Sequence, residues 1–284
     1  EEKIKKEAEK LGVNLDGVIF YDPNNCATID QMSEILRKRR EKKGMTFEAA
    51  KATMLSDPRF FAAMLVKQGR VDGMVAGSIS PTAHVLRASI LVIGPKEGLK
   101  TISSSFVMVT DSNFGANGTL IFTDAAVIPN PTALQLADIA ISAVEKAKVT
   151  AGIKEPKVAF LSYSTKGSAD GESVRKVREA IEILKMRDVD FEFDGEMQLD
   201  AAIVPEVAKL KAPNSKVAGN ANVLVFPDLN AGNIGYKLTQ RFSGAKALGP
   251  LIQGLARPVH DLSRGCSVED IVEVVAITAV ESDE

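Results

Sequence analysis

The stretch from residue 103 to residue 123 decides the fold, and it reads SSSFVMVTDSNFGANGTLIFT. Two runs of β-forming residues, 103–109 and 119–123, flank a turn rich in glycine and asparagine that includes Asn117-Gly118. Such a turn between two apolar runs predicts an antiparallel hairpin. Elsewhere the chain alternates single strands with helices, which is typical of parallel sheets. A hairpin within that alternation predicts a mixed sheet and a second domain that begins near residue 100.

Apolar runs and helical periodicity predict the elements outside this stretch. Strands are expected at 17–21, 71–77, 158–163, 191–193, 223–227 and 247–254, and helices at 1–11, 29–43, 46–55, 57–68, 133–150 and 199–210. A chain of 284 residues is long enough for one large or two medium α/β domains. We find no internal repeat or flexible linker, so two domains would be joined by short connections. The cleft between them is where α/β proteins bind ligands.

Composition and charge exclude several kinds of partner. The formal net charge of −2 argues against nucleic acid or an anionic membrane surface as the main partner. A polyanionic ligand must therefore be bound by a local basic pocket. No apolar run reaches the roughly 18 residues of a membrane span, and the first residues lack the apolar segment of a signal peptide. We expect a cytoplasmic protein with Cys26 and Cys266 reduced.

The first residue is not methionine, and the chain opens within a helical pattern. We therefore expect an N-terminal piece to be missing from this sequence. A basic run at 37–43, which includes Arg40, is typical of the solvated C-terminal end of a helix.

Two loops could bind an anion through hydroxyls and backbone N–H groups. The first, 78–87, follows a predicted strand and opens a helix. Ser80 could cap that helix, with Pro81 at its first position. The residues do not decide between a loop that only caps the helix and one that also binds a ligand. The second loop, 164–171, lacks the G-x-x-x-x-G-K-[ST] pattern, so we do not expect a nucleotide P-loop.

Residues 261–270 read DLSRGCSVED and lead into a predicted apolar helix. They bring together the hydroxyl of Ser263, the guanidinium of Arg264 and the carboxylate of Asp270, which can hold an anion beside a proton acceptor. Helix capping explains part of the pattern, because Ser267 and Asp270 have the spacing of a capping-box variant. Capping does not explain why Arg264 precedes a glycine.

Other familiar catalytic patterns are missing from the sequence. It contains no His-x-x-x-His, Cys-x-x-Cys or G-x-S-x-G, and no G-x-G-x-x-G fingerprint around Gly232 and Gly235. The sequence therefore argues against metal-dependent hydrolysis and against hydrolase-type acyl transfer as the function of this chain.

The chain resembles the phosphate acetyltransferase (phosphotransacetylase) family over essentially its whole length. The matching blocks are VDGMVAGS at 71–78, Thr82-Ala83 with VLR at 85–87, NPT at 130–132, LSYST at 161–165, DGE at 194–196, APNS at 212–215, FPDLNAGNIGYK at 226–237 and DLSRGCS at 261–267. Their order and spacing make the resemblance specific. The sequence departs from the commoner family form at PTAH, 81–84, where a second threonine and an acidic residue are usual.

This resemblance implies acetyl transfer between acetyl phosphate and coenzyme A, with coenzyme A as a substrate and with no metal, tightly bound cofactor or covalent acyl-enzyme. It assigns Asp270 as the base that acts on the thiol and Arg264 as the group that steadies phosphate and developing charge. Ser263 assists the thiol or the tetrahedral intermediate. The partners expected are coenzyme A, acetyl phosphate, phosphate and a second copy of the chain in a homodimer, with no nucleic acid or membrane.

Four further positions match residues that bind substrate in the family. Arg87 and Arg40 match arginines implicated in substrate binding, and Ser78 and Thr82 match hydroxyl positions near acetyl phosphate.

The resemblance also implies a fold with two α/β domains around an interdomain cleft. The architecture would be three-layer α/β/α and similar to that of isocitrate and isopropylmalate dehydrogenases. Domain I would comprise 1–99 and 253–284, so that the C-terminal segment completes it, and domain II would comprise 100–252.

Proton transfer from the thiol limits the mechanism. A free thiol with a pKa of about 8.5 and a free aspartate with a pKa of about 3.9 differ enough that full transfer costs roughly 6 kcal/mol. We therefore expect proton transfer to be concerted with attack of the sulfur in a ternary complex, unless burial or a nearby cation assists it.

Three alternatives remain open at this point. A phosphate butyryltransferase-like enzyme would use the same chemistry on longer acyl groups. A non-catalytic acetyl-CoA-sensing module would bind coenzyme A without transfer. A metal-dependent decarboxylating dehydrogenase would need a cluster of metal-binding aspartates that the sequence does not display.

Overall fold

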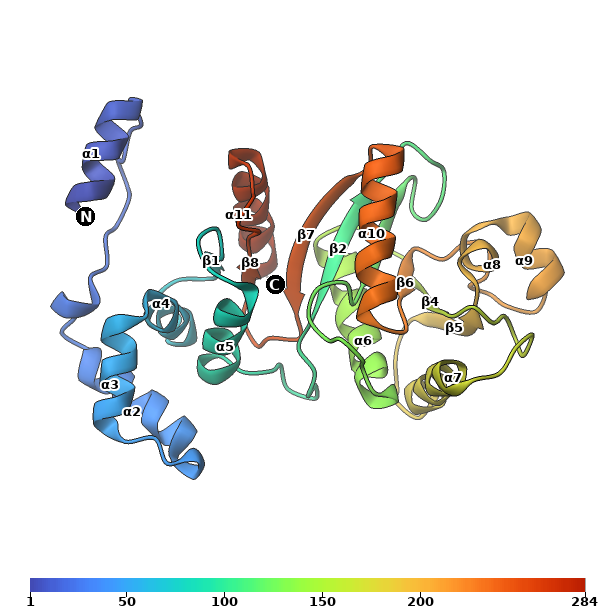
Figure 1. Ribbon diagram of the computed structural model, residues 1–284, viewed down its shortest axis with the longest axis horizontal. Coiled ribbons are helices and arrows are strands. Elements are labelled where there is room, and N and C mark those ends of the chain that lie inside the picture. The colour runs from blue at the N-terminus through green and yellow to red at the C-terminus, as the bar shows by residue number, and fades with distance from the viewer. Residues whose placement is uncertain (284) are drawn as a thin grey trace.

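The computed structural model describes residues 1–283 and shows a mixed α/β protein (Figure 1). Its helices are α1 (Glu2–Leu11), α2 (Ile29–Arg40), α3 (Phe47–Ser56), α4 (Pro58–Lys67), α5 (Thr82–Val92), α6 (Ala133–Val149), α7 (Glu172–Lys185), α8 (Leu199–Ile203), α9 (Pro205–Lys211), α10 (Leu229–Ser243) and α11 (Val268–Ser282). Its strands are β1 (Met74–Ala76), β2 (Ser103–Val109), β3 (Thr119–Thr123), β4 (Lys157–Leu161), β5 (Glu192–Met197), β6 (Val223–Val225), β7 (Lys246–Gln253) and β8 (Val259–Asp261).

The larger sheet has six strands in the order β5-β4-β6-β3-β2-β7. Strands β2 and β3 form the predicted hairpin, with a register that runs from Ser105 opposite Thr123 to Val109 opposite Thr119. Strand β2 is also antiparallel to β7, whereas β3, β6, β4 and β5 are parallel to one another. The prediction of a mixed sheet that starts just after residue 100 is therefore confirmed.

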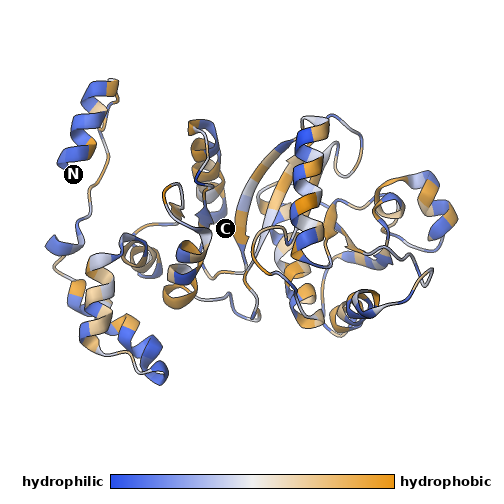
Figure 2. Ribbon diagram, viewed as in Figure 1, coloured by the Kyte–Doolittle hydropathy of each residue, from blue (hydrophilic) through white to orange (hydrophobic). Residues whose placement is uncertain are grey.

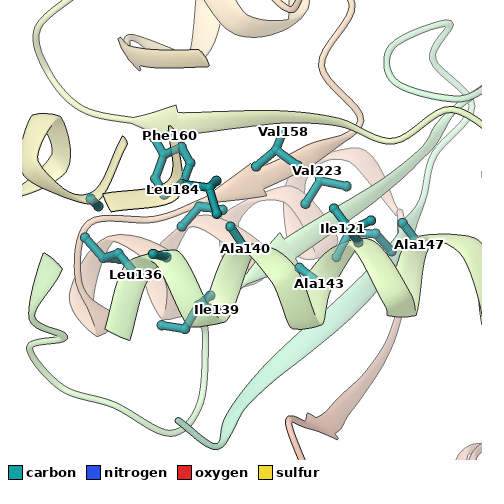
Figure 3. Close-up of a cluster of buried hydrophobic side chains, with 14 of the residues drawn as sticks. Ile121, Leu136, Ile139, Ala140, Ala143, Ala147, Val158, Phe160, Leu184 and Val223 are labelled. Atoms are coloured by element: carbon teal, nitrogen blue, oxygen red, sulfur yellow. The ribbon is translucent and has the colours of Figure 1, made fainter. Parts of the chain in front are cut away.

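Helices cover both faces of this sheet. On one face, α6 and α7 pack through a cluster that includes the buried side chains of Leu136, Phe160 and Leu184 (Figure 3). On the other face, α8, α9 and α10 enclose a second cluster around Met108 and Met197. Successive residues of a strand point to opposite faces, so each strand supplies both clusters. The result is a three-layer α/β/α arrangement, as expected.

The smaller sheet contains only β1 and β8, which are parallel. Their register pairs Met74 with Val259 and Ala76 with Asp261, although these residues are far apart in the chain. Helices α2, α3, α4 and α5 surround a third apolar cluster next to these strands, whereas the C-terminal end of α2 is hydrophilic (Figure 2). The segment at 261–270 follows β8 and the loop at 78–87 follows β1, so the pairing of these strands brings the two segments together.

The predicted strand at 17–21 is wrong. Residues 17–21 form no strand, and Val18, Ile19 and Tyr21 are 50%, 72% and 41% exposed. The segment is an extended connection to α1, which lies apart from the other helices in Figure 1. A strand requires a hydrogen-bonded neighbour, and no strand within residues 1–283 pairs with this one.

Three local boundaries also differ from the sequence prediction. The helix expected at 199–210 is divided into α8 and α9, because Pro205 cannot continue the backbone hydrogen bonds of α8. Strand β5 continues to Met197, beyond residue 193 where the predicted strand ends. Helix α5 begins at Thr82 with Pro81 as its N-cap and no side-chain cap, so Ser80 is not the capping residue.

No helix formed by residues 1–283 is both long enough and apolar enough to cross a membrane. Cys26 and Cys266 are both free thiols, which agrees with the expectation that they form no disulfide.

Candidate active site

The candidate site is built where β1 and β8 end side by side. Because these strands are parallel, the loop after β1 and the turn after β8 leave the sheet at the same edge. The N–H of Leu262 donates to the carbonyl of Ala76 at 2.7 Å and holds the two chain segments together. Ser78 and Thr82 therefore lie on the loop next to the turn that carries Ser263 and Arg264.

Gly77 makes this close approach possible. Its φ of +118° is rarely adopted by residues with a side chain, and a Cβ there would lie 2.2 Å from Oδ1 of Asp261 and 2.5 Å from the carbonyl oxygen of Leu262. Any larger residue would push the loop after β1 away from the end of β8.

Thr82 connects the two loops through its side chain. It is the first residue of α5 and is half-buried, and its hydroxyl donates to Oδ2 of Asp261. The other carboxylate oxygen, Oδ1, is buried and has no hydrogen-bond partner among the described residues. Burial raises the pKa of Asp261 to about 6, although the hydrogen bond from Thr82 opposes that rise.

The turn after β8 leads directly into α11. Ser263 and Arg264 are exposed, and Oγ of Ser263 accepts a hydrogen bond from the N–H of Gly265 at 3.2 Å. Ser267 caps α11 as predicted, since its Oγ accepts from the N–H of Asp270 at 3.1 Å. Oδ2 of Asp270 in turn accepts from the N–H of Ser267 at 2.8 Å, which completes the capping box.

Asp270 and Arg264 make no hydrogen bond or ion pair with each other among residues 1–283. Asp270 is exposed, and its carboxylate is oriented by the backbone of Ser267. The capping box thus fixes the carboxylate at the start of α11, on the solvent side of the turn.

The two remaining arginines lie on helices. Arg87 is exposed on α5, five residues after Thr82. Arg40 is the last residue of α2, a helix that packs against α5, and it lies outside the two loops at the strand ends. The structure therefore gathers Ser78, Thr82 and the 263–264 turn, and it places Arg40 more remotely.

The loop at 164–171 is already occupied by a side chain of the protein. Glu196 is buried, and its Oε1 accepts from Oγ of Ser164 at 2.8 Å and from the N–H of Gly167 at 2.9 Å. Burial raises the pKa of Glu196, but its hydrogen bonds with Arg178, Gly167 and Ser164 outweigh that effect and hold the pKa at about 2. This carboxylate accepts the hydrogen bonds that a phosphate would need. The loop is therefore part of an internal hydrogen-bond network and does not offer these donors to a ligand.

Asp261 is the residue of this site to which the sequence assigned no role. Its position two residues before Ser263, in the same DLSR stretch, was the available signal. The contact with Thr82 spans 179 residues of chain and could not be read from spacing.

A cavity of about 720 Å³ lies at the opposite end of β8, and its lining includes Lys146, Gln253, Arg257 and Glu281. It contains none of the predicted site residues. Among residues 1–283, no group of three or more His, Cys, Asp or Glu side chains could hold a metal ion.

Comparison with known proteins identifies the family of the chain. The family described as Phosphate acetyl/butaryl transferase matches residues 1–279. A phosphate acetyltransferase from Clostridium acetobutylicum is 52% identical over 283 residues, which cover 99% of this chain and 84% of the relative. The sequence resemblance is therefore confirmed.

Solved structures share the fold. A phosphotransacetylase from Streptococcus pyogenes matches with a TM-score of 0.92 and 44% identity, covering 99% of this chain and 84% of that chain. A branched-chain phosphotransacylase from Enterococcus faecalis matches with a TM-score of 0.67 and 25% identity, covering 79% and 78%. The chain belongs to the phosphate acetyl/butyryl transferase family of acyltransferases.

Proposed function

We propose that the chain is a phosphate acetyltransferase that moves an acetyl group reversibly between acetyl phosphate and coenzyme A. The thiolate attacks the acetyl carbonyl directly in a ternary complex, with coenzyme A as a substrate and no tightly bound cofactor. The observation that carries this proposal is the pairing of β1 with β8. It places Ser78 and Thr82 beside the turn of Ser263 and Arg264, where an acyl phosphate can meet hydroxyls and a cation.

Three residues on the turn and at the start of α11 perform the chemistry. Arg264 binds the phosphate and stabilises the charge that develops on it. Asp270 accepts the thiol proton, and Ser263 hydrogen-bonds the thiol or the tetrahedral intermediate. Because Asp270 is exposed, water solvates its carboxylate until the substrates bind. Proton transfer concerted with sulfur attack avoids the cost of a free thiolate.

Four residues bind the substrates around this centre. Ser78 and Thr82 contact acetyl phosphate from the loop after β1, and Arg87 approaches from α5. Arg40 contributes from the end of α2, on the outer part of the site. Together the arginines supply the local basic pocket that a protein of net charge −2 needs for polyanionic substrates.

We also propose the organisation of the whole protein. Residues 1–99 and 253–284 form domain I and residues 100–252 form domain II, with the substrates in the cleft between them. Two copies associate as a homodimer, and the enzyme works in the cytoplasm.

The test is a thiol-dependent assay of acetyl-CoA formation from acetyl phosphate and coenzyme A, run without added metal. Butyryl phosphate is compared in parallel, because the matched family includes butyryl transferases and a branched-chain phosphotransacylase shares the fold. Faster transfer from butyryl phosphate would assign the longer acyl group. Binding of coenzyme A without phosphate-dependent transfer would instead identify a sensing module.

A further inference from the structure

The departing phosphate needs a proton that the base on the thiol side does not supply. When the sulfur attacks, the bond between carbon and sulfur forms, the bond between the carbonyl carbon and the bridging oxygen breaks, and the thiol proton passes to Asp270. The phosphate would leave as a trianion, a very basic species, unless a donor protonates it. Asp270 lies at the start of α11 with its carboxylate held by the backbone of Ser267. A second proton donor on the phosphate side would let the phosphate leave as hydrogen phosphate.

Asp261 and Thr82 have the geometry of such a donor. Asp261 is 1% exposed at the end of β8, so it does not reach a substrate directly. The hydroxyl of Thr82 donates to its Oδ2, and Thr82 itself is half-buried at the start of α5, next to the loop after β1. A hydroxyl can donate one proton while it accepts another. Thr82 is thus placed to relay a proton.

The surroundings of Asp261 favour its protonated form more than water does. Oδ1 packs against Gly77 and has no described hydrogen-bond donor, so an ionised carboxylate there is only partly satisfied. Burial raises its pKa to about 6, against the lowering by the Thr82 hydrogen bond. A bound dianionic acyl phosphate would raise it further, since like charges disfavour ionisation.

Titratable groups on the neighbouring elements do not disturb this balance. No titratable group described on these elements makes a hydrogen bond or ion pair with Asp261. The groups are Lys246 on β7, His84 and Arg87 on α5, Arg264 on the turn, and Glu269, Asp270, Glu273 and Glu281 on α11. The proton affinity of Asp261 is therefore set by burial and by Thr82.

We propose that Asp261 is a positioning residue that holds a proton for the departing phosphate and passes it through the hydroxyl of Thr82. This inference rests on the proposed function. Asp261 gives its proton to Oγ1 of Thr82 while the hydroxyl proton of Thr82 moves to the phosphate, which leaves as hydrogen phosphate. Asp270 ends protonated and Asp261 ends ionised, and exchange with solvent restores both. The reverse reaction uses the same path, with Asp261 accepting the proton of the attacking phosphate.

The experiment measures kcat, KM and pH dependence for Asp261→Asn, Thr82→Val and Thr82→Ser in the full chain. An asparagine preserves the shape and a hydrogen bond to Thr82 but has no proton to give, so kcat should fall about 100-fold, with the KM for coenzyme A unchanged within about twofold. Thr82→Val should cause a similar loss, and Thr82→Ser should restore turnover to within about threefold. Ser89→Ala removes a buried hydroxyl elsewhere on α5, one that donates to the carbonyl of Val85, and should keep wild-type turnover.

The pH profile separates this role from a structural one. Only the protonated carboxyl can supply the proton, so kcat/KM of the wild type for acetyl phosphate should fall as pH rises through the pKa of Asp261, about 6 in the free protein. Asp261→Asn should lack that decline.

Turnover near wild type in Asp261→Asn or Thr82→Val, with an unchanged pH profile, would overturn the proposal. Failure of Thr82→Ser to recover activity would also overturn it, because the hydroxyl would then not be the relevant group. Thr82 is only half-buried, so its variants remain informative even where Asp261→Asn does not fold. An inactive wild type would overturn the proposed function itself, which distinguishes the two failures.

Discussion

Arg264 is an exposed cation at the end of β8 that forms no ion pair within residues 1–283. A free guanidinium beside Ser263 is available for a phosphate group. Arg264→Ala should lower kcat about 100- to 1000-fold, because a charge-assisted contact to the reacting group is lost. Steady-state kinetics of acetyl-CoA formation measure this effect, with Arg257→Ala as a control from the opposite end of β8. A change confined to the affinity for coenzyme A would contradict the role.

Asp270 has two functions that one substitution can separate. Its carboxylate caps the N–H of Ser267, and it is our proposed base. Asp270→Asn keeps an oxygen that can accept this hydrogen bond, so α11 should remain folded while kcat falls about 100-fold or more. Circular dichroism and the pH dependence of kcat are the measurements, and Glu269→Gln on the preceding residue is the matched control. Near wild-type turnover with an unchanged pH profile would show that another group is the base.

At the scale of elements, α10 carries an exposed apolar stripe. Ile234, Leu238 and Phe242 are spaced four residues apart and therefore lie on one side of the helix, and Phe242 is 87% exposed. Isolated exposed apolar residues are ordinary, but a continuous helical stripe is typical of an interface. We assign it to the proposed homodimer.

Phe242→Glu should convert the proposed dimer to a monomer, because it places a charge within an apolar contact. Analytical ultracentrifugation measures the mass directly. Leu210→Glu is the control, since Leu210 is also 85% exposed but lies on α9, away from the stripe. A Phe242→Glu protein that sedimented like the wild type would exclude α10 from the interface.

At the scale of the whole molecule, a buried ionic cluster joins the larger sheet to the C-terminal helix. Lys146 on α6 pairs with Glu281 on α11, which also accepts from Oγ1 of Thr150 at 2.7 Å. Nδ1 of His260 accepts from the N–H of Ile252 at 3.1 Å, so Nε2 carries the proton and donates to Glu281 at 3.0 Å. This cluster borders the cavity at the far end of β8.

Glu281→Gln should lower the free energy of unfolding at pH 7 by about 3 kcal/mol, because Lys146 would remain buried without its counter-charge. Burial raises the pKa of Glu281, but the hydrogen bond from His260 and the charge of Lys146 outweigh it and hold the pKa at about 2. A carboxyl group with a lower pKa in the folded state than in the unfolded state stabilises the fold at pH values above its unfolded pKa of about 4.3. That stabilisation is lost as the pH falls toward 2 and the carboxylate becomes protonated. The difference between wild type and Glu281→Gln should therefore shrink between pH 5 and pH 2.

Urea denaturation at several pH values tests this expectation. Asp190→Asn breaks the surface pair with Lys148, where Asp190 is 82% exposed, and should cost less than about 1 kcal/mol. If both variants lost the same free energy of unfolding, the buried cluster would not stabilise the contact between the larger sheet and α11.

The sequence alone determined those features that depend on residues close together in the chain. The hairpin follows from Asn117-Gly118 between two apolar runs, and the cap of α11 follows from Ser267 and Asp270 at a spacing of three residues. The order of short motifs also identified the family, which the comparisons confirm. In the hairpin and the cap the interacting groups are close together in the chain, so spacing fixes their geometry.

Tertiary structure decided what depends on distant partners. Residues 17–21 have the composition of a strand, but a strand forms only where a neighbouring strand pairs with it. None of the described strands pairs with these residues. Thr82 and Asp261 meet only because β1 and β8 are parallel and Gly77 lets their loops approach. Burial at that contact, which no local pattern encodes, changes the proton affinity of Asp261. The sequence thus named the turn to which we assign the chemistry, and the packing of two remote strands placed the carboxyl group of Asp261 behind it.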